Sequence, residues 1–184
     1  MTPAEHHAAV AAGFTRRVDG VRDWQAPAPV DGWVARDVVG HLVGWLPGFL
    51  AGGGILLDTD GPQVEDDPAG AWHAHVTAVQ ALLDGPESEQ EFSHPQVGTH
   101  RLGSAIDMFY TTDVFLHTWD LARATGQDDT LDPAFAAEVL AGMEPIEEML
   151  RQSGQYGPKV PVAEDAPVQD RLMGFIGRDP AWGR

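Results

Sequence analysis

The chain has 184 residues, with 11 basic and 28 acidic side chains and no cysteine. This length fits a single domain, residues 1–184, and an apolar fraction of 43% predicts a folded core rather than disorder. The formal net charge of −17 argues against binding to nucleic acid or to anionic membranes, and the lack of cysteine excludes disulfides, cysteine-type zinc sites and a thiol nucleophile within the chain.

The first predicted helix opens with a capping box, Thr2-Pro3-Ala4-Glu5, and should run to about Asp23. The same N-terminal residues lack the basic start and the apolar run of a secretory signal, so we expect a cytoplasmic location. A proline-rich link at 25–32 separates this helix from a second one at about 36–50, which should end at the glycine triplet 52–54.

The stretch 38–57 could be taken for a membrane span. It has no acidic or basic side chain over about the length of a bilayer, and its glycines at 40, 44, 48 and 52 have the spacing of a membrane dimer face. A proline in the middle, the glycine triplet and flanks without basic anchors argue against a span. We therefore expect no membrane partner and a buried helix with closely packed small residues, packed within the chain or across a homodimer.

The remaining predicted elements are helices joined by polar loops. Proline at the first turn and glycine after the last mark most of their boundaries. The polar segment 87–100 has room for a short hairpin, and Pro145 should kink the fifth helix. The predicted ranges are an acidic loop at 58–66 and helices at 68–84, 102–125, 133–153 and 168–176. Together they predict an all-α bundle with long connections and an extra short C-terminal helix.

The long fourth helix carries the most informative pattern. Asp113, His117 and Asp120 fall on one face of it among apolar neighbours. An ionised carboxylate is costly to bury alone, so something inside the bundle must compensate Asp113, and a divalent metal would do so. A different stripe of this helix, mostly polar, is the expected solvent face: Asp107, Thr111, Val114 and Thr118.

Asp113 and His117 are four residues apart, a spacing at which two helical side chains can hold one ion. His41 is the expected third ligand, because an imidazole has little reason to lie in the apolar run around it. Two imidazoles and one carboxylate leave coordination positions open, as in catalytic sites. Asp113 could instead pair only with His117, and His41 could be a core histidine bound to a carbonyl. Asp120 could orient the ring of His117 or pair with Arg123.

The other histidines are weaker candidates. Residues two apart do not share a helix face, so at least one of His73 and His75 should be exposed. The histidines at 94 and 100 lie in the polar segment and should be surface residues, and those at 6 and 7 could approach the site. Neither a phosphate-binding loop nor a serine in a nucleophile-elbow context is present in the sequence.

Three parts of the chain carry a family resemblance. They are GWVARDVVGHL at 32–42, DVFLHTWDLA at 113–122, and a tail with GPKVPV at 157–162, QDRL at 169–172 and GRDP at 177–180. With helices in this order, the chain resembles the DinB-like superfamily of metal-binding four-helix bundles. It is most similar to an actinobacterial group related to the N-terminal metal-binding domain of mycothiol-dependent maleylpyruvate isomerase, and the resemblance spans nearly the whole chain.

This resemblance implies a DinB-like four-helix bundle that holds a divalent ion, zinc or nickel, through His41, Asp113 and His117. Two departures from the family matter. Val34 stands where the family usually has Ser or Thr, so the second helix should lack its side-chain cap. The isomerase also has a C-terminal domain that contributes to its active site, and these residues contain no counterpart, so we do not expect maleylpyruvate isomerisation itself.

The expected function is that of a metal-dependent transferase or isomerase that uses a low-molecular-weight thiol, mycothiol, as cosubstrate with a small electrophile. A thiol that coordinates a metal loses its proton, and the thiolate is the nucleophile. The alternative is a non-catalytic metal- or ligand-binding protein linked to stress. In a third interpretation, the bundle is purely structural and its acid and histidine form only a buried polar bond.

Overall fold

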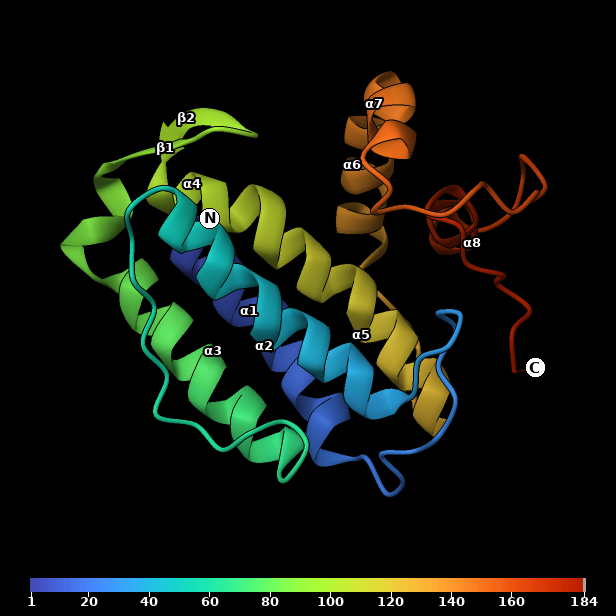
Figure 1. Ribbon diagram of the computed structural model, residues 1–184. Coiled ribbons are helices and arrows are strands. Elements are labelled where there is room, and N and C mark those ends of the chain that lie inside the picture. The colour runs from blue at the N-terminus through green and yellow to red at the C-terminus, as the bar shows by residue number, and fades with distance from the viewer. Residues whose placement is uncertain (184) are drawn as a thin grey trace.

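The computed structural model describes residues 1–183 and is mostly helical, with one two-stranded sheet (Figure 1). The predicted helices are present close to their expected positions, and the hairpin forms in the polar segment. The elements in chain order are α1 (Pro3–Asp19), α2 (Ala35–Gly52), α3 (Pro68–Asp84), the 3-10 turn η1 (Pro86–Glu89), β1 (Glu91–His94), β2 (Gly98–Arg101), α4 (Leu102–Ala105), the π-helical η2 (Ile106–Thr111), α5 (Thr112–Thr125), α6 (Pro133–Met143), the 3-10 turn η3 (Glu144–Ile146), α7 (Glu147–Gln152) and α8 (Val168–Phe175).

Helix α1 begins at the predicted capping box. The backbone N–H of Glu5 donates to the hydroxyl of Thr2, and the N–H of Thr2 donates to the carboxylate of Glu5. The helix ends at Asp19, however, so the predicted end at Asp23 is wrong. Gly20 forms the C-cap and its N–H bonds back to the last carbonyls of the helix.

Helix α2 has no side-chain N-cap, as Val34 predicts. Of the two hydrogen bonds of a capping box, only one is present: the backbone N–H of Val34 donates to the carboxylate of Asp37 at 2.9 Å. The helix continues through Pro47 and ends at the glycine triplet. Within residues 1–183 no helix is long and apolar enough to cross a membrane.

Two of the four glycines in the predicted stripe of α2 do not pack as predicted. Gly44 and Gly48 are exposed, and a Cβ atom at either position would meet no other atom within 4 Å. The expectation of close packing at these glycines is therefore wrong within the chain. The buried face of α2 is formed instead by its larger residues: Val38, Val39, Leu42, Leu46 and Leu50.

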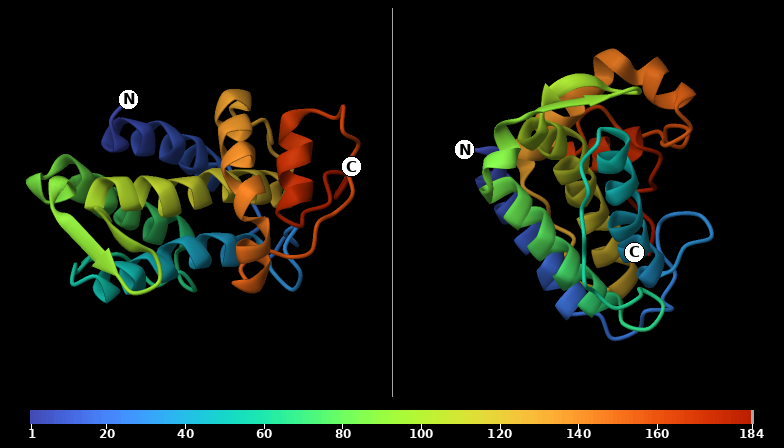
Figure 2. Two further views of the ribbon diagram at one scale, coloured as in Figure 1. Left: turned by 90° about the horizontal axis from the view of Figure 1, so that it is seen from above. Right: turned by 60° about the vertical axis from the view of Figure 1, so that its left-hand side comes forward.

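Four helical segments lie side by side: α1, α2, α3 and the continuous α4–η2–α5 (Figure 1). Helix α1 contacts α3 and α5, and α2 contacts the same two helices. Their apolar faces meet in one core that includes Phe14, Leu42 and Trp72, all fully buried. The hairpin pairs Phe92 with His100 and buries Phe92 in this core, and Figure 2 shows it lying along one edge of the helices.

Helix α5 is buried on nearly all sides, so the predicted solvent stripe is wrong. Thr111, Val114 and Thr118 are all buried, and only Asp107 is partly exposed. Packing of α1 against this side of the helix is the cause. Both hydroxyls have partners: Thr118 donates to the carbonyl of Val114 on its own helix, and Thr111 shares a hydrogen bond with His7 of α1.

The C-terminal helices α6 and α8 pack against α5 near its C-terminal half (Figure 2). A second apolar cluster joins α5, through Phe115 and Trp119, to α6 and α8, where Leu140 and Leu172 are buried. Pro145 interrupts the predicted fifth helix: α6 stops at Met143, a 3-10 turn follows, and α7 resumes at Glu147. The interruption is the one that an internal proline predicts.

Two histidines of the core are kept neutral by burial. Burial lowers the pKa of His7 to about 4, with the charges of His75 and His6 as further causes, and burial lowers the pKa of His75 to about 4. Each folded pKa is thus below the unfolded value of 6.5. Between these values the unfolded chain binds more protons than the folded one, so stability present above pH 6.5 is lost as the pH falls towards 4.

We therefore expect the free energy of unfolding to fall by about 3 kcal/mol for each of the two histidines between pH 6.5 and 4. Urea unfolding at several pH values measures this loss. The variant His75→Leu should show a flatter pH profile, whereas His73→Leu, which changes a half-exposed side chain on the same helix, should keep the steep one. A His75→Leu profile as steep as that of the unmodified protein would contradict the assignment.

Candidate metal centre

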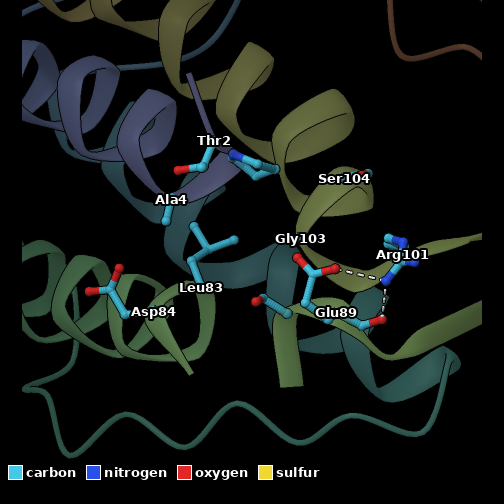
Figure 3. A pocket seen from close by; sticks show the side chains of 10 residues that line it. Thr2, Ala4, Leu83, Asp84, Glu89, Arg101, Gly103 and Ser104 are labelled. Carbon is cyan, nitrogen blue, oxygen red and sulfur yellow. Dashed lines mark hydrogen bonds and ion pairs between the residues drawn. The ribbon is translucent and has the colours of Figure 1, made fainter. Parts of the chain in front are cut away.

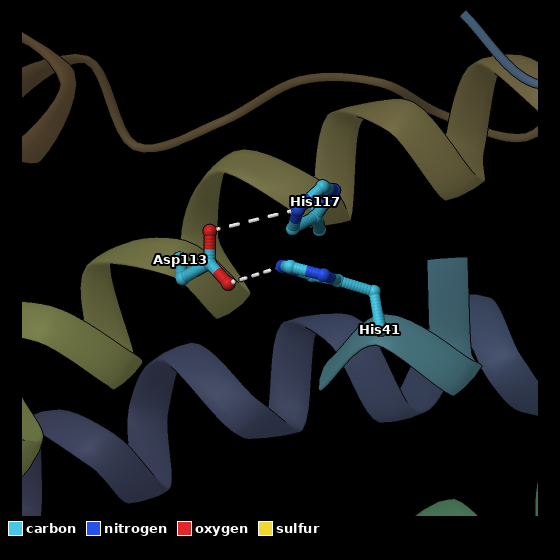
Figure 4. A group of neighbouring side chains, drawn as sticks. All are labelled: His41, Asp113 and His117. Carbon is cyan, nitrogen blue, oxygen red and sulfur yellow. Dashed lines mark hydrogen bonds and ion pairs between the residues drawn. The ribbon is translucent and has the colours of Figure 1, made fainter. Parts of the chain in front are cut away.

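The three predicted ligands lie together between α2 and α5 (Figure 4). His41 Nε2 donates to Asp113 Oδ2 at 3.0 Å, and His117 Nε2 lies 3.5 Å from Asp113 Oδ1. One ligand atom from each of the three residues lies within 4.8 Å of the other two. The structure therefore brings together, from two helices, the trio that the sequence pattern selected.

These separations fit a divalent ion. Two atoms that each lie about 2.0–2.1 Å from a tetrahedral zinc ion are about 3.3 Å apart. The contacts of His41 and His117 with the two oxygens of Asp113, at 3.0 and 3.5 Å, are close to this spacing, and the 4.8 Å limit that holds for one atom from each residue is wider. Two imidazoles and one carboxylate are also a donor set that zinc and nickel accept. The side chains of His41 and Asp113 are 33% and 19% exposed, which leaves the trio open to small molecules from one side.

The helical context places the pair on α5. Asp113 and His117 are one turn apart, which puts both side chains on the same face. The π-helical turn η2 ends directly before α5, at Thr111. Such single π-helical turns within α-helices are frequent at functional sites.

Two tryptophans surround the ligands. Trp45 Nε1 donates to Asp113 Oδ2 at 2.9 Å, so this carboxylate oxygen accepts hydrogen bonds from both Trp45 and His41. The ring of Trp33 stacks on that of His117 at 5.8 Å between centroids, with an interplanar angle of 19°, and lies 5.3 Å from the ring of His41. Both indole rings therefore lie directly against the predicted ligands.

Asp120 orients the ring of His117. His117 Nδ1 donates to Asp120 Oδ2 at 2.8 Å, which leaves Nε2 facing Asp113. Arg178 donates to both oxygens of Asp120, from Nε at 3.0 Å and from Nη2 at 3.1 Å. Arg123 does not take part, because it pairs with Asp129. Of the two roles considered for Asp120, the structure shows the contact with His117.

Neighbouring groups of opposite charge shift the pKa values of Asp113, His117 and Asp120 toward their charged forms. Burial raises the pKa of Asp113, but the neighbouring His117 and the hydrogen bonds from His41 and Trp45 outweigh it and hold that pKa below its usual range. Burial likewise raises the pKa of Asp120, but His117 and Arg178 outweigh this effect and hold that pKa below its usual range. Burial lowers the pKa of His117, and the two carboxylates raise it above the ordinary value. Both acids are therefore anionic at neutral pH and attract a cation.

The remaining histidines lie elsewhere. His6 bonds to Asp107 and His7 to Thr111, so neither of these weaker candidates joins the trio. His73 is half-exposed and His75 is fully buried, in line with the expectation that at least one of them faces solvent. The histidines at 94 and 100 lie in the two strands of the hairpin and are partly exposed.

A surface cleft of about 360 Å³ lies apart from the trio (Figure 3). It is formed where the start of α1, the end of α3 and the start of α4 meet, and it includes Thr2, Asp84 and Ser104. Its charged side chains Glu89 and Arg101 form an exposed ion pair with each other. None of the three predicted ligands lines this cleft, so it is separate from the candidate metal centre.

Three residues of the site were not selected from the sequence: Trp33, Trp45 and Arg178. Trp45 follows His41 by four residues, so helical spacing alone could have indicated it. Trp33 and Arg178 lie within the segments that carry the family resemblance, but only the folded chain shows that they contact His117 and Asp120.

Comparison with known proteins gives relatives but no function. Neither a family model nor a solved structure matches the chain. Two proteins of Mycobacterium tuberculosis are similar to it over nearly their full length: uncharacterized protein MT0763 of strain CDC 1551 / Oshkosh and uncharacterized protein Rv0738 of strain ATCC 25618 / H37Rv. Each is 28% identical over 182 residues, which is 97% of this chain and 98% of the relative. Neither name states an activity, so function has to be argued from the site.

Proposed function

We propose that the chain is a DinB-like four-helix bundle whose ion, zinc or nickel, activates a low-molecular-weight thiol for transfer or isomerisation. Mycothiol is the proposed thiol and a small electrophile the second substrate. The convergence of His41, Asp113 and His117 carries this proposal. The side-by-side arrangement of α1, α2, α3 and α4–η2–α5 supports the bundle.

Each residue has a task in this proposal. His41 and His117 offer neutral nitrogen ligands and Asp113 offers an anionic oxygen, which leaves a position open in a four-coordinate site. A bound divalent ion would lower the pKa of a coordinated thiol, so that thiolate is present at neutral pH. The chain has no cysteine, so the thiol must come from outside.

The surrounding side chains prepare the ligands. Asp120 accepts a hydrogen bond from the Nδ1–H group of His117. The proton therefore stays on Nδ1 and the Nε2 lone pair is free for a metal, an arrangement that recurs at histidine metal ligands. Trp45 holds one carboxylate oxygen of Asp113 and leaves the other directed at His117. Trp33 covers both imidazoles and limits the access of water.

The test is the consumption of an electrophile by zinc-loaded protein with and without mycothiol. We expect thiol-dependent consumption that is lost in His117→Ala and retained in His73→Ala, which removes a half-exposed imidazole outside the site. If the unmodified protein is no faster than His117→Ala, the proposal of catalysis fails.

A protein that holds a metal or small ligand without turnover is the second candidate. The observation in its favour is the dense hydrogen bonding of Asp113 and Asp120, which suits the retention of an ion as well as catalysis. Calorimetry separates the two candidates: a catalytic site should bind mycothiol in the zinc-loaded protein, whereas a retention site should bind the metal and show no heat with the thiol.

A further inference from the structure

A second group of polar side chains meets inside the core, away from the metal ligands. It consists of His7 from α1, His75 from α3 and Tyr110 from the π-helical turn η2, and all three are 0% exposed. The ring of Tyr110 lies 5.8 Å from that of His7 and 5.6 Å from that of His75, between centroids. Three separate elements thus bring hydrogen-bonding groups to one place in an apolar interior.

Most of these groups lack a partner in the protein. His7 Nδ1 shares a hydrogen bond of 3.0 Å with the hydroxyl of Thr111. Over residues 1–183, His7 Nε2, both ring nitrogens of His75 and the hydroxyl of Tyr110 are buried without any hydrogen bond to the chain. Buried polar atoms in native proteins are nearly always bonded, and leaving several unbonded would remove much of the stability of a domain.

The chemistry of the cluster favours a neutral ligand. Burial lowers the pKa of both histidines to about 4, so their imidazoles are uncharged at neutral pH. Neither histidine has an acidic hydrogen-bond partner in the described part of the chain. A buried cation without a counter-charge is costly, so a metal ion is disfavoured here. Each neutral imidazole and the phenol can both donate and accept, which calls for a ligand that does the same.

We propose that His7, His75 and Tyr110 form an internal hydration site, in which ordered water bridges α1, α3 and η2. Water donates two and accepts two hydrogen bonds, and buried waters make about three bonds to groups that are otherwise unbonded. The site adjoins the metal centre through Trp45, whose ring lies 5.6 Å from that of Tyr110 and whose indole N–H bonds Asp113. This inference does not depend on the proposed catalytic function.

The variant Tyr110→Phe distinguishes a hydrated cluster from a dry one by the direction in which it changes the melting temperature. If water bonds the hydroxyl, its removal breaks a hydrogen bond and should lower the melting temperature by about 2–4 °C. If the hydroxyl is unbonded, its removal relieves a buried polar group and should raise the melting temperature. Tyr156→Phe, at the only other tyrosine, is the control for loss of a phenol hydroxyl.

A double-mutant cycle provides a second, independent test of the shared water. Tyr110→Phe and His75→Leu should be non-additive in stability, because both remove partners of the same water although the side chains share no direct hydrogen bond. Additive effects, or a rise in melting temperature for Tyr110→Phe, would overturn the proposal.

A crystal structure of the metal-free protein provides the direct observation. Density for water within hydrogen-bond distance of at least two of His7, His75 and Tyr110 is expected, and it should be lost or displaced in Tyr110→Phe. An empty cluster would overturn the proposal, as would a metal ion at this position after growth of the crystals with zinc.

Discussion

Replacement of His117 by alanine is expected to weaken the binding of zinc by more than about 100-fold. His117 is the most buried of the three ligands, and its ring is held by Asp120 on one side and faces Asp113 on the other. Loss of a supporting contact alone lowers metal affinity by about 10–100-fold, so loss of a ligand should exceed that range. Elemental analysis after purification and competition with a chromophoric chelator measure the effect.

Matched variants make this result specific. Asp113→Asn removes the charge but keeps the shape of the side chain, and it should also weaken zinc binding strongly. His73→Ala removes a half-exposed imidazole and should leave zinc binding unchanged. Zinc affinity in His117→Ala equal to that of the unmodified protein would show that the trio is only a hydrogen-bonded cluster, the alternative that the sequence left open.

The grouping of His41, Asp113 and His117 could be predicted because its signal is local. Asp113 and His117 are one helical turn apart, and His41 is a polar exception within an apolar run. Neither fact needs the tertiary structure. The start of α1 is local in the same sense, since the capping box at Thr2 determines where hydrogen bonds within the helix can begin. Its end was predicted wrongly, although Gly20 stands directly after the last turn.

The errors arise where tertiary contacts decide. The stripe through Thr111 and Thr118 was predicted to face solvent because it is more polar than its neighbours, but α1 covers it and the hydroxyls find partners nearby. Gly44 and Gly48 suggested close packing, but no element approaches them. The polarity and size of the side chains on a helix face limit which elements can pack against it. The tertiary path of the chain decides whether any element does so.

The contact of Arg178 with Asp120 could not be predicted for the same reason, because 58 residues separate the two in the chain. The variant Arg178→Met is expected to lower the free energy of unfolding by about 3–5 kcal/mol, since it leaves a fully buried carboxylate without its guanidinium partner. Arg171→Met on α8 is the control. Arg171 is largely exposed and lies 4.0 Å from Glu144, so its loss should change stability by no more than about 0.5 kcal/mol.

The double variant Asp120→Asn/Arg178→Met tests whether the effect arises from the unpaired charge. Removing both charges should recover much of the stability lost in Arg178→Met, because the buried position then holds a neutral amide. Zinc affinity should not recover in parallel, since an amide holds the His117 ring less firmly than a carboxylate does and lacks its charge. Recovery of stability together with full zinc affinity would mean that Asp120 and Arg178 only pack the α5–α8 interface. Recovery of stability alone would mean that they also orient the metal ligand.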